Sequence, residues 1–358
     1  MKIVFFSRFF YPHIGGVEKH VLEISKRLVK KGYEVIVVTE ELTSENSSQR
    51  LNVLKHLNKG EEVQKIKIVR IQVGRNDWFK KFRIWRELWK YRSLINNADV
   101  IHCHDVFYWY LPFRFLSPTK KVFTTFHGYE GNKIPGKRAI IMHKIAEVLS
   151  FGNICVGDFL KKWYGTTATY VTYGAVKVQS STLRFHSGQE FKILYIGRLE
   201  EEAGILQYLK ALKILSEKFN FEVTVLGDGS LRKEAGEFCK RNNLKVDFKG
   251  FVKNVESYLP KADYVFTSRY LGILEAMAAK KPVLAHYNNS IKKDYLEMSP
   301  FAKWIVIDHS PDKLAEKFND SLQNKEKREE NINKAYDWVK NQTWEEVLNT
   351  YEKLWKLT

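Results

Sequence analysis

Short, nearly continuous apolar runs alternate along the chain with longer segments of helical periodicity. The runs KIVFFS (2–7) and FKILYIG (191–197) each end at a loop, as strands buried on both faces of a parallel sheet do. After the first run, apolar residues recur at helical spacing from Val17 to Val29, and a second run lies within 30–39. This order of strand, helix and strand predicts an α/β fold with parallel sheets and helices on both faces.

The same order occurs a second time in the C-terminal half. Residues 205–219 have helical spacing, and 221–227 form the next apolar run. A chain of 358 residues also exceeds one ordinary core. We therefore expect two α/β domains, 1–178 and 191–335, joined by the polar linker 179–190, and a helical segment, 336–358, that packs back toward the first domain. Further strands are expected at 98–103, 121–128, 153–157, 245–251, 262–268 and 281–287.

Positive charge is concentrated in the first half of the chain. The formal net charge is +18. Residues 1–180 carry 30 Lys and Arg against 15 Asp and Glu, an excess of +15, whereas residues 181–358 carry 29 against 26, an excess of +3. Such a field indicates an anionic partner for the first half, and nucleic acid, an acidic lipid surface or a phosphorylated substrate all fit.

Composition and cysteine usage favour a cytoplasmic globular protein. With 44% hydrophobic and 28% charged residues, the chain is not of the disordered class. The opening MKIVFFSRFF is too short an apolar run for a secretion signal, and no run approaches the ~20 residues of a membrane span. Cys103, Cys155 and Cys239 fit neither a disulfide framework nor a zinc site.

In the first half, candidate functional residues follow the predicted strands, where parallel sheets bind ligands. Gly15 and Gly16 open the first helix and let N–H groups approach an anion, although a flexible turn explains them too. His127 ends the strand 121–128, and we interpret it as a site residue, although a lone histidine is more often structural. Another strand ends in His102, His104 and Asp105; without a further carboxylate nearby, metal binding is not expected there.

In the second half, three loops carry candidate residues. Gly197 and Arg198 follow the run 191–197, where a helix beginning after Gly204 suits a phosphate. Gly227-Asp228-Gly229 follows the next run and is most simply a turn, although it could border a nucleotide. In SRYLGILEAMAAKKPV (268–283) a helix is expected to begin near Gly272. This places Glu275 in the first turn, where the helix dipole favours a carboxylate and ribose hydroxyls can donate to it.

Taken in order, these segments resemble the retaining glycosyltransferases of family four, which have the GT-B architecture of two facing Rossmann-like domains. YPHIGGVEKHVLEISKRLVKKGYEVIVVT resembles the family's glycine-rich opening, DVIHCHD and FTTFHG its acceptor-domain strands, and YVTYGAV its interdomain strand. GRLEEEAGI, VTVLGDGSLR, VDFKGFV and ADYVFTSRYLGILEAMAAKKPV follow in the order of its donor domain. The resemblance covers nearly the whole chain.

The resemblance implies a nucleotide-sugar donor in the second domain and an acceptor in the first. As catalytic residues, Arg198 would contact the donor diphosphate, Glu275 the ribose and His127 the transferred sugar. No metal or other cofactor is implied, because arginine and helix N-termini replace it, and the co-substrate is left open among UDP-, GDP- and ADP-sugars. The implied donor-binding residues are Gly15, Gly16, Gly197, Arg198, Ala203, Gly227, Asp228, Gly272, Ile273, Leu274 and Glu275, and the acceptor-side residues are Glu18, His20, His104 and Asp105.

Two features depart from the family pattern. Ala203 stands where the family has a lysine five residues after the arginine, and the loop 268–272 is shortened, so that Glu275 lacks its usual second glutamate. Losing one such cation costs on the order of 10²–10³ in rate. Three explanations are open: Arg269 or Lys280 supplies the charge, the enzyme is slow or degenerate, or Ala203 is an engineered replacement that traps a complex. The third is slightly favoured.

The segment WFKKFRIWRELWKYRSLI (78–95) combines aromatic and cationic residues. A core helix with a solvated basic face explains this pattern as well as a helix lying in a membrane interface does. The charge of the first half favours the membrane, since each suitably placed Lys or Arg gains roughly 1 kcal/mol near anionic lipid. The expected helix carries an aromatic stripe of Trp78, Phe82, Trp85 and Trp89, widened by Ile84, Leu88, Tyr91 and Ile95, with the cations Lys80, Lys81 and Arg83 beside it.

The prediction is therefore a cytoplasmic, retaining and metal-independent glycosyltransferase, peripherally associated with the inner face of the cell membrane. Its expected acceptor is anionic, lipid-linked or phosphorylated. One alternative is a non-catalytic nucleotide-sugar-binding protein, which the missing lysine would explain. A basic nucleic-acid-binding protein lacks a recognisable module, and the basic half argues against a starch- or sucrose-type synthase with a soluble acceptor.

Overall fold

The computed structural model describes all residues except 14, 42–61, 76, 129–132, 179–189, 253 and 357–358. The chain forms two compact units: unit 1 comprises Met1–Glu130, Pro135–Thr172 and Trp344–Thr358, and unit 2 comprises Gly131–Ile134 and Tyr173–Thr343. The expected linker 179–190 lies outside the described residues except for its last residue. The boundaries expected at 178 and 335 differ from the observed 172 and 343. The second difference arises because α12 (Lys325–Val339) packs on α9 (Tyr270–Ala278) within unit 2.

Unit 1 is built on a sheet with the strand order β3-β4-β2-β1-β5-β6-β7-β8. All neighbouring strands are parallel except β3 and β4, so the predicted parallel sheet is confirmed. The strands are β1 (Lys2–Ser7), β2 (Glu34–Glu40), β3 (Glu62–Val63), β4 (Ile66–Ile71), β5 (Val100–His104), β6 (Val122–Phe126), β7 (Asn153–Val156) and β8 (Tyr170–Thr172).

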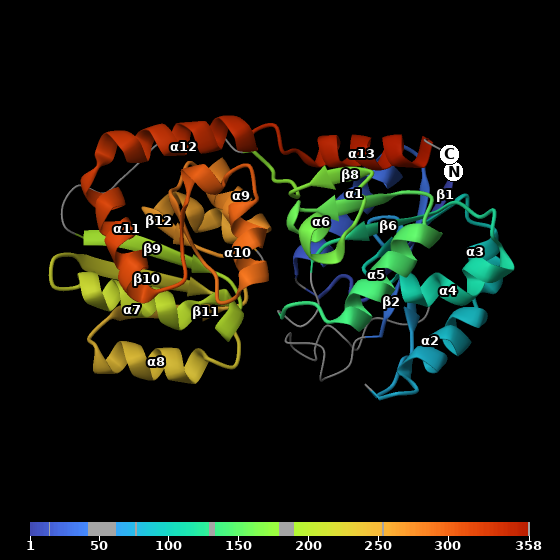
Figure 1. Cartoon of the computed structure of the whole chain (residues 1–358), viewed down its shortest axis with the longest axis horizontal. Coiled ribbons are helices and arrows are strands. Elements are labelled where there is room, and N and C mark those ends of the chain that lie inside the picture. The colour runs from blue at the N-terminus through green and yellow to red at the C-terminus, as the bar shows by residue number, and fades with distance from the viewer. Residues whose placement is uncertain are drawn as a thin grey trace. The chain divides into compact units, whose positions relative to one another are not determined.

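Phe5 and Phe6, adjacent in β1, show how both faces of this sheet are covered, because successive strand side chains point to opposite faces. Phe5 lies edge-on to Tyr351 of α13 (Trp344–Lys356), and Phe6 contacts Trp109 of α4 (Phe107–Leu116). α13 and α1 (Gly16–Lys30) cover one face, and α4 and α2 (Lys80–Trp89) cover the other (Figure 1). The remaining helices are α3 (Arg92–Asn96), α5 (Lys137–Leu149) and α6 (Phe159–Tyr164).

Unit 2 contains an entirely parallel sheet with the strand order β11-β10-β9-β12-β13-β14. The chain proceeds outward from β9 to β11 and then returns to β12 on the other side of β9. The strand order therefore reverses between β9 and β12, and in unit 1 it reverses in the same way between β1 and β5. Ligands of such sheets bind beyond the strand ends at these switch points. The strands are β9 (Glu190–Ile196), β10 (Asn220–Leu226), β11 (Lys245–Gly250), β12 (Tyr264–Phe266), β13 (Val283–His286) and β14 (Val306–Asp308).

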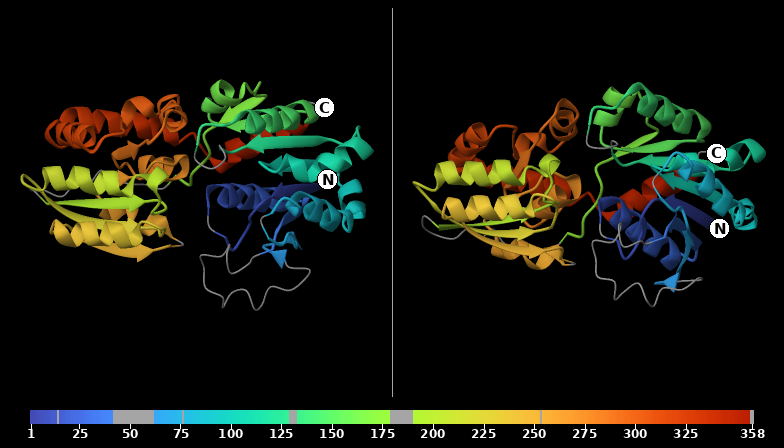
Figure 2. Two further views of the ribbon diagram at one scale, coloured as in Figure 1. Left: turned by 60° about the horizontal axis from the view of Figure 1, so that its bottom comes forward. Right: turned by 90° about the horizontal axis from the view of Figure 1, so that it is seen from below.

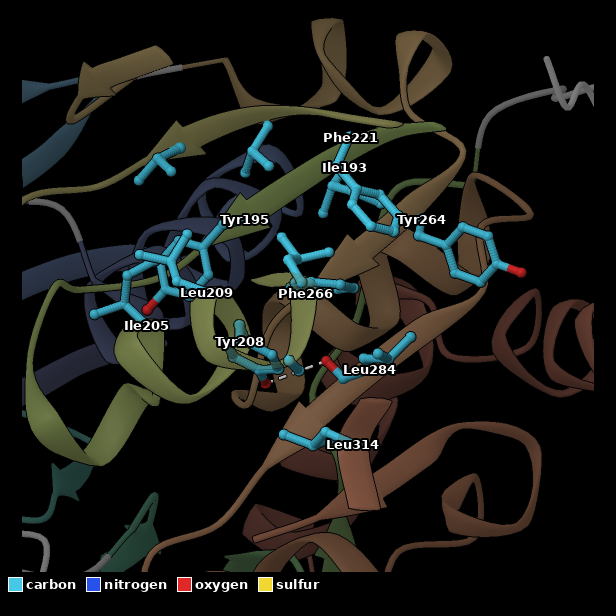
Figure 3. Packing of buried hydrophobic residues seen from close by; sticks show 14 of the residues in the cluster. Ile193, Tyr195, Ile205, Tyr208, Leu209, Phe221, Tyr264, Phe266, Leu284 and Leu314 are labelled. Carbon is cyan, nitrogen blue, oxygen red and sulfur yellow. Dashed lines mark hydrogen bonds between the residues drawn. The ribbon is translucent and has the colours of Figure 1, made fainter. Parts of the chain in front are cut away.

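Aromatic and aliphatic side chains fill the space between the sheet of unit 2 and three helices on one face. These helices are α7 (Ile205–Leu215), α8 (Arg232–Arg241) and α11 (Pro311–Gln323), and all three contribute to one buried cluster with β9, β10 and β12. Tyr208 stacks on Phe266 in this cluster, and its hydroxyl donates to Leu284 O at 3.2 Å (Figure 3). On the other face lie α9, α10 (Ser290–Glu297) and α12, whose arrangement can be followed in Figures 1 and 2. Short 3₁₀ turns occupy Glu201–Ala203, Val255–Ser257, Leu259–Lys261 and Ala302–Trp304.

The prediction of a single helix over 78–95 is wrong, because the segment forms two helices. α2 ends at Trp89 and α3 begins at Arg92, while Trp78 precedes α2. The last turn of α2 tightens: the N–H groups of Lys90 and Tyr91 donate to carbonyls three residues back, at Glu87 and Leu88. The expected widening of the stripe is also wrong, since Ile84, Leu88 and Ile95 are buried and Trp85, half-buried, donates through Nε1 to Tyr108 O.

Fewer aromatic residues of the expected stripe are exposed than predicted, and the exposed cations are not the ones expected. Trp78 and Phe82 are exposed to 78% and 57%, and Phe79, Trp89 and Phe115 of α4 are exposed as well. Two expected membrane cations have internal partners. Lys80 pairs with the buried Glu40 at 3.0 Å, and Arg83 donates to Val73 O and to Asp77. Lys81 lies over the Tyr108 ring at 5.5 Å, and Arg86 and Lys90 are exposed.

The helix expected to begin near Gly272 begins two residues earlier, at Tyr270. The Tyr295 hydroxyl accepts the Tyr270 N–H at 2.7 Å, and the two rings stack with their centroids 3.9 Å apart. Glu275 is therefore the sixth residue of α9 and not in its first turn, so the explanation through the helix dipole is wrong.

Candidate functional site

The loops after β9 and β10 are locked together at the switch-point end of unit 2. Gly227 has a φ of +141°, and a Cβ on it would lie 1.8 Å from Gly197 O. Leu199 N–H donates to Asp228 O at 2.9 Å. Only glycine fits at 227, because both the dihedral and the close approach exclude a side chain. Gly197, Arg198, Gly227 and Asp228 are thereby held in one place.

The three glutamates that follow Arg198 have different surroundings. Glu200 accepts from the Ser230 N–H at 3.0 Å and from the Ser230 hydroxyl at 2.6 Å, so it ties the two loops together. Glu201 is exposed. Glu202 Oε1 accepts from Arg198 Nη2 at 2.7 Å and lies 3.8 Å from Arg269 Nη2. Two guanidiniums from different loops therefore converge on one carboxylate oxygen.

Gly204 lies against His286 of β13, directly after Ala203. Ala203 is buried, and Gly204, with a φ of +80°, precedes α7. A Cβ on Gly204 would lie 2.4 Å from His286 Cδ2, and the N–H of His286 donates to Ser268 Oγ at 2.8 Å. Burial lowers the pKa of His286 to about 4, so the imidazole is neutral at physiological pH.

A buried lysine lies next to this arrangement. Lys292 of α10 is fully buried, its ammonium donates to Ser268 O, and its Nζ lies 4.2 Å from the centroid of the Tyr295 ring. Burial holds the pKa of Lys292 well below its usual value, and the positive charges of Arg269 and Arg198 lower it further, while Glu202 opposes them.

The two residues that the sequence offered as a second cation differ in position. Arg269 directly precedes α9 and reaches Glu202 beside Arg198. Lys280 follows the far end of this nine-residue helix, and its Nζ lies 4.5 Å from the centroid of the Tyr336 ring. The length of α9, about 13 Å, separates them along the chain. Of these two, Arg269 alone lies at the cluster of Arg198 and Glu202.

The first turn of α9 brings a glycine against β12. A Cβ on Gly272 would lie 2.5 Å from Thr267 Oγ1, a buried hydroxyl without a hydrogen-bond partner among the described residues. Glu275 is buried one turn further on. Ile273 and Leu274 are buried as well, and Ile273 N–H already donates to Arg269 O at 3.0 Å. Of the expected donor residues in this helix, Gly272 is therefore the one in its first turn.

In unit 1, three of the four residues expected on the acceptor side, His20, His104 and Asp105, lie together with His127 near the switch point. His104 Nδ1 lies 2.9 Å from His127 Nε2, and the centroids of the His20 and His127 rings are 4.8 Å apart. Asp105 Oδ1 accepts the N–H of His127 at 2.8 Å. Asp105 has a φ of +60°, a conformation that Asp adopts more readily than most residues.

A chain of hydrogen bonds leads from α13 to this cluster. Trp355 Nε1 can only donate, so His102 Nδ1 accepts at 3.1 Å. His102 therefore carries its proton on Nε2 and donates it to Thr125 Oγ1 at 2.7 Å. The Tyr351 hydroxyl lies 2.8 Å from Thr125 Oγ1 and 2.9 Å from His20 Nε2. Hydrogen bonds among α13, β5, β6 and α1, four elements distant in sequence, thus orient His102 and His20.

The same reasoning orients His127. His104 Nε2 is buried and has no hydrogen-bond partner among the described residues. An unpaired buried N–H is rarer than an unpaired acceptor, so we place the His104 proton on Nδ1 and let it donate to His127 Nε2. His127 then carries its own proton on Nδ1, which leaves this N–H as a donor for a ligand.

These histidines are neutral. Burial lowers the pKa of His20 to about 3 and holds those of His102, His104 and His127 well below 6.5. A protonated histidine in this cluster would lower the pKa values of the other histidines further. The imidazoles can therefore exchange hydrogen bonds at physiological pH, but they add nothing to the positive charge of the first half.

Gly15 and Gly16 stand at the start of α1, as expected. Gly15 precedes the helix and Gly16 is its first residue. The Glu18 carboxylate folds back over this end, since a Cβ on Gly15 would lie 2.1 Å from Glu18 Oε2. Glu18 Oε1 also lies 2.9 Å from His13 Nδ1. An internal carboxylate therefore occupies the helix N-terminus, where the dipole favours negative charge.

Two sequence models of glycosyltransferases match the chain. "Glycosyltransferase Family 4" matches residues 14–165, and "Glycosyl transferases group 1" matches residues 183–338. The chain belongs to the group 1 glycosyltransferases. The two matches correspond broadly to the two units, and the predicted resemblance to family four is confirmed.

Relatives of this glycosyltransferase cover its whole length. An uncharacterized glycosyltransferase of Methanocaldococcus jannaschii is 26% identical over 99% of both chains. A Campylobacter jejuni N-acetylgalactosaminyltransferase named for a diNAcBac-PP-undecaprenol substrate is 37% identical over 76 residues, 21% of each chain. The crystal structure of Anabaena HepE with UDP and glucose has a TM-score of 0.75 at 14% identity and covers both chains fully. The GT-B fold class is thereby confirmed.

Sequence reasoning missed several residues of this glycosyltransferase's candidate site. The helical segment expected over 336–358 includes α13, but nothing in the sequence indicated that the hydroxyl of Tyr351 meets His20. Glu202 and Lys292 carried no motif. Among the described residues, no group of three His, Cys, Asp or Glu is arranged to hold a metal ion, and no helix there is long and apolar enough to cross a membrane.

Replacing Gly227 by alanine tests the locked loops of this glycosyltransferase. Because the new Cβ meets Gly197 O and the dihedral disfavours a side chain, we expect Gly227→Ala to lower the free energy of unfolding by at least about 2 kcal/mol. Gly236→Ala is the control: it lies inside α8 with open space around it, and should raise that free energy by up to about 1 kcal/mol. Urea unfolding measures both. Equal midpoints for the two variants would contradict the close approach.

The buried histidines predict an acid-sensitive fold. Their pKa values are lower in the folded than in the unfolded chain, so the unfolded state takes up protons first as the pH falls. The histidines contribute their full share to the free energy of unfolding above about pH 6.5. Below this pH each histidine lowers that free energy by up to about 1.4 kcal/mol for every pH unit, until the pKa of the folded state is reached. Urea unfolding at pH 7.5 and 5.5 measures the loss. His20→Gln should reduce the pH dependence; an unchanged slope for this variant would contradict burial of a neutral His20 ring.

Proposed function

We propose that this glycosyltransferase is retaining and metal-independent, and that it moves a sugar from a nucleoside diphosphate sugar to an anionic or lipid-linked acceptor at a membrane surface. The observation that carries the proposal is Arg198 at the switch point of unit 2. Its guanidinium, more than half exposed, stands where the strand order reverses and already binds a carboxylate. A diphosphate offers the same guanidinium two negatively charged groups.

The remaining residues of unit 2 support a nucleotide donor. Gly197 and Gly227 keep side chains away from the loops beside Arg198, and the first turn of α9 presents N–H groups of Leu271 and Gly272. Glu275, one turn along, is proposed to accept hydrogen bonds from the ribose hydroxyls. The relative HepE was crystallised with UDP and glucose, which agrees with a donor of this class.

In the proposed reaction, the bond between the sugar C1 and the diphosphate oxygen breaks while the acceptor oxygen bonds to C1 on the same face. The acceptor hydroxyl proton passes to the leaving diphosphate, so no further base is required. Arg198 stabilises the negative charge that grows on that diphosphate. His127, neutral and with a proton on Nδ1, is proposed to donate a hydrogen bond to a hydroxyl of the transferred sugar.

Two observations support an acceptor at an anionic surface. The Campylobacter jejuni relative is named for an undecaprenol-linked substrate. Unit 1 holds most of the excess positive charge, and on it the exposed aromatics Trp78, Phe79 and Phe82 lie near the cations Lys81 and Arg86. We propose that this patch inserts its rings among lipid headgroups while the cations attract anionic lipid.

Turnover of nucleotide sugars tests the donor site. We expect the wild-type protein to release UDP, GDP or ADP from one donor of a panel, and Arg198→Ala to lower kcat on the order of 10²–10³-fold. Arg241→Ala, which removes the same charge from the end of α8, should leave kcat unchanged. NMR of the product should show the anomeric configuration of the donor. Donor binding without any release would instead favour a non-catalytic nucleotide-sugar-binding protein.

Liposome flotation tests the membrane patch. We expect the protein to float with vesicles containing anionic lipid at low salt, and Phe79→Ser/Phe82→Ser to lose most of this binding. Ile214→Ser/Met298→Ser removes two exposed apolar side chains from unit 2 and should have no effect. Equal recovery with neutral vesicles would contradict the electrostatic contribution. Loss of flotation on Ile141→Ser/Val148→Ser alone would place the contact on α5 instead.

A further inference from the structure

Two guanidiniums of like charge are brought together at the switch point of unit 2. Arg198 follows β9 and Arg269 follows β12, the two strands between which the strand order reverses. Both approach Glu202 Oε1, at 2.7 and 3.8 Å. The Glu202 side chain is mostly buried, whereas those of Arg198 and Arg269 are more exposed. The cations therefore remain accessible to a ligand, while the anion between them is internal.

A buried lysine, whose pKa is lowered, lies behind these two guanidiniums. Lys292 donates to Ser268 O, the carbonyl directly before Arg269. The groups that act on its ammonium are Arg269, Arg198 and Glu202, together with the ring of Tyr295 on its own helix and the neutral His286 of β13. Burial of a charged ammonium is costly without an opposite charge. Among these groups, Glu202 carries the opposite charge and favours the protonated form of Lys292.

The two neighbours of position 203, where the family has its lysine, are linked to these groups. Ala203 immediately precedes Gly204, whose backbone lies against His286. The His286 N–H donates to Ser268 Oγ, and Ser268 O accepts from Lys292. Three contacts therefore connect the residue after Ala203 with the amine of Lys292. Glu202, the residue before Ala203, bridges Arg198 and Arg269.

We propose that Arg269 and Lys292 together replace the missing lysine at 203. Arg269 binds the donor diphosphate directly, beside Arg198. Glu202 is an internal anion that holds both guanidiniums in place and is displaced by the diphosphate. Lys292 takes up a proton when the diphosphate binds and then supplies positive charge from behind Ser268. This inference rests on the proposed function, because it assigns residues to the diphosphate of the same donor.

The assignment explains why the loop after β9 tolerates an alanine. As the bond to the sugar breaks, negative charge grows on the leaving diphosphate, and preorganised cations stabilise it most effectively. Here Glu202, which is negatively charged like the phosphate groups of the ligand, already positions the two guanidiniums. Shortening of the loop 268–272 places Arg269 at the end of β12, from which it reaches Glu202.

Isothermal titration with UDP, inorganic pyrophosphate and uridine tests the role of Arg269. We expect Arg269→Ala to weaken UDP and pyrophosphate binding by about 10- to 100-fold, the range for one charged hydrogen-bond partner, and to leave uridine binding unchanged. Glu202→Gln should tighten pyrophosphate binding about fivefold, since a neutral acceptor competes less for the guanidiniums. Arg241→Ala is the charge-matched control and should bind all three ligands as the wild type does.

Proton uptake tests Lys292. Because a bound diphosphate favours the charged ammonium, titration of UDP at pH 8 in buffers of different ionisation enthalpy should show net proton uptake by the wild type. Lys292→Met should abolish this uptake, whereas Lys293→Met, an exposed neighbour on α10, should preserve it. Uptake that persists in Lys292→Met would overturn the assignment of Lys292. A purely structural lysine would not change proton uptake on binding.

The outcomes separate this inference from the proposed function. If the wild type binds neither UDP, pyrophosphate nor any nucleotide sugar, the proposed function fails. If the wild type binds UDP and Arg269→Ala matches Arg241→Ala, the inference alone fails. Ala203→Lys gives a further comparison: if Arg269 and Lys292 already supply the charge, kcat should change less than about tenfold, whereas a gain on the order of 10²–10³ would show that the lysine had not been replaced.

Discussion

The candidate donor site of unit 2 depends on one interaction: Arg198 and Arg269 share the carboxylate of Glu202 where the strand order reverses. Parallel strands place the loops after β9 and β12 side by side, and the locked glycines at 197 and 227 fix the loop that carries Arg198. Glu202 then keeps Arg198 and Arg269 close despite their like charge. Without this arrangement the second unit would present one arginine and a buried alanine, a poor site for a diphosphate.

At the switch point of unit 1, between β1 and β5, neutral histidines take the place that charged arginines have in unit 2. There the buried histidines have pKa values lowered by desolvation, so their imidazoles are uncharged and are joined by hydrogen bonds. α13 completes it, because Trp355 and Tyr351 set the proton positions of His102 and its partners. A neutral donor such as His127 suits a sugar hydroxyl, and the positive charge of this unit lies elsewhere on its surface.

Most of the architecture could be predicted from the sequence, because buried parallel strands and amphipathic helices leave strong periodic signals. The strand ends also indicated which residues would gather, as with Arg198 and Gly227 in unit 2 or His104 and His127 in unit 1. What could not be predicted depends on tertiary contacts. The start of α9 is fixed by the hydroxyl of Tyr295, 25 residues away, and the break after Trp89 and the partners of Lys80 carry no local signal. Lys292 is an ordinary lysine in sequence, and only the packing of α10 buries its amine and lowers its pKa.

The proposed binding of a diphosphate by two arginines at the switch point of unit 2 is tested most directly by a crystal structure of the protein with UDP bound. We expect both phosphates within hydrogen-bond distance of the Arg198 and Arg269 guanidiniums, with the Glu202 carboxylate turned away from them. Nucleotide bound elsewhere, or a diphosphate at Arg198 with Arg269 still on Glu202, would contradict it.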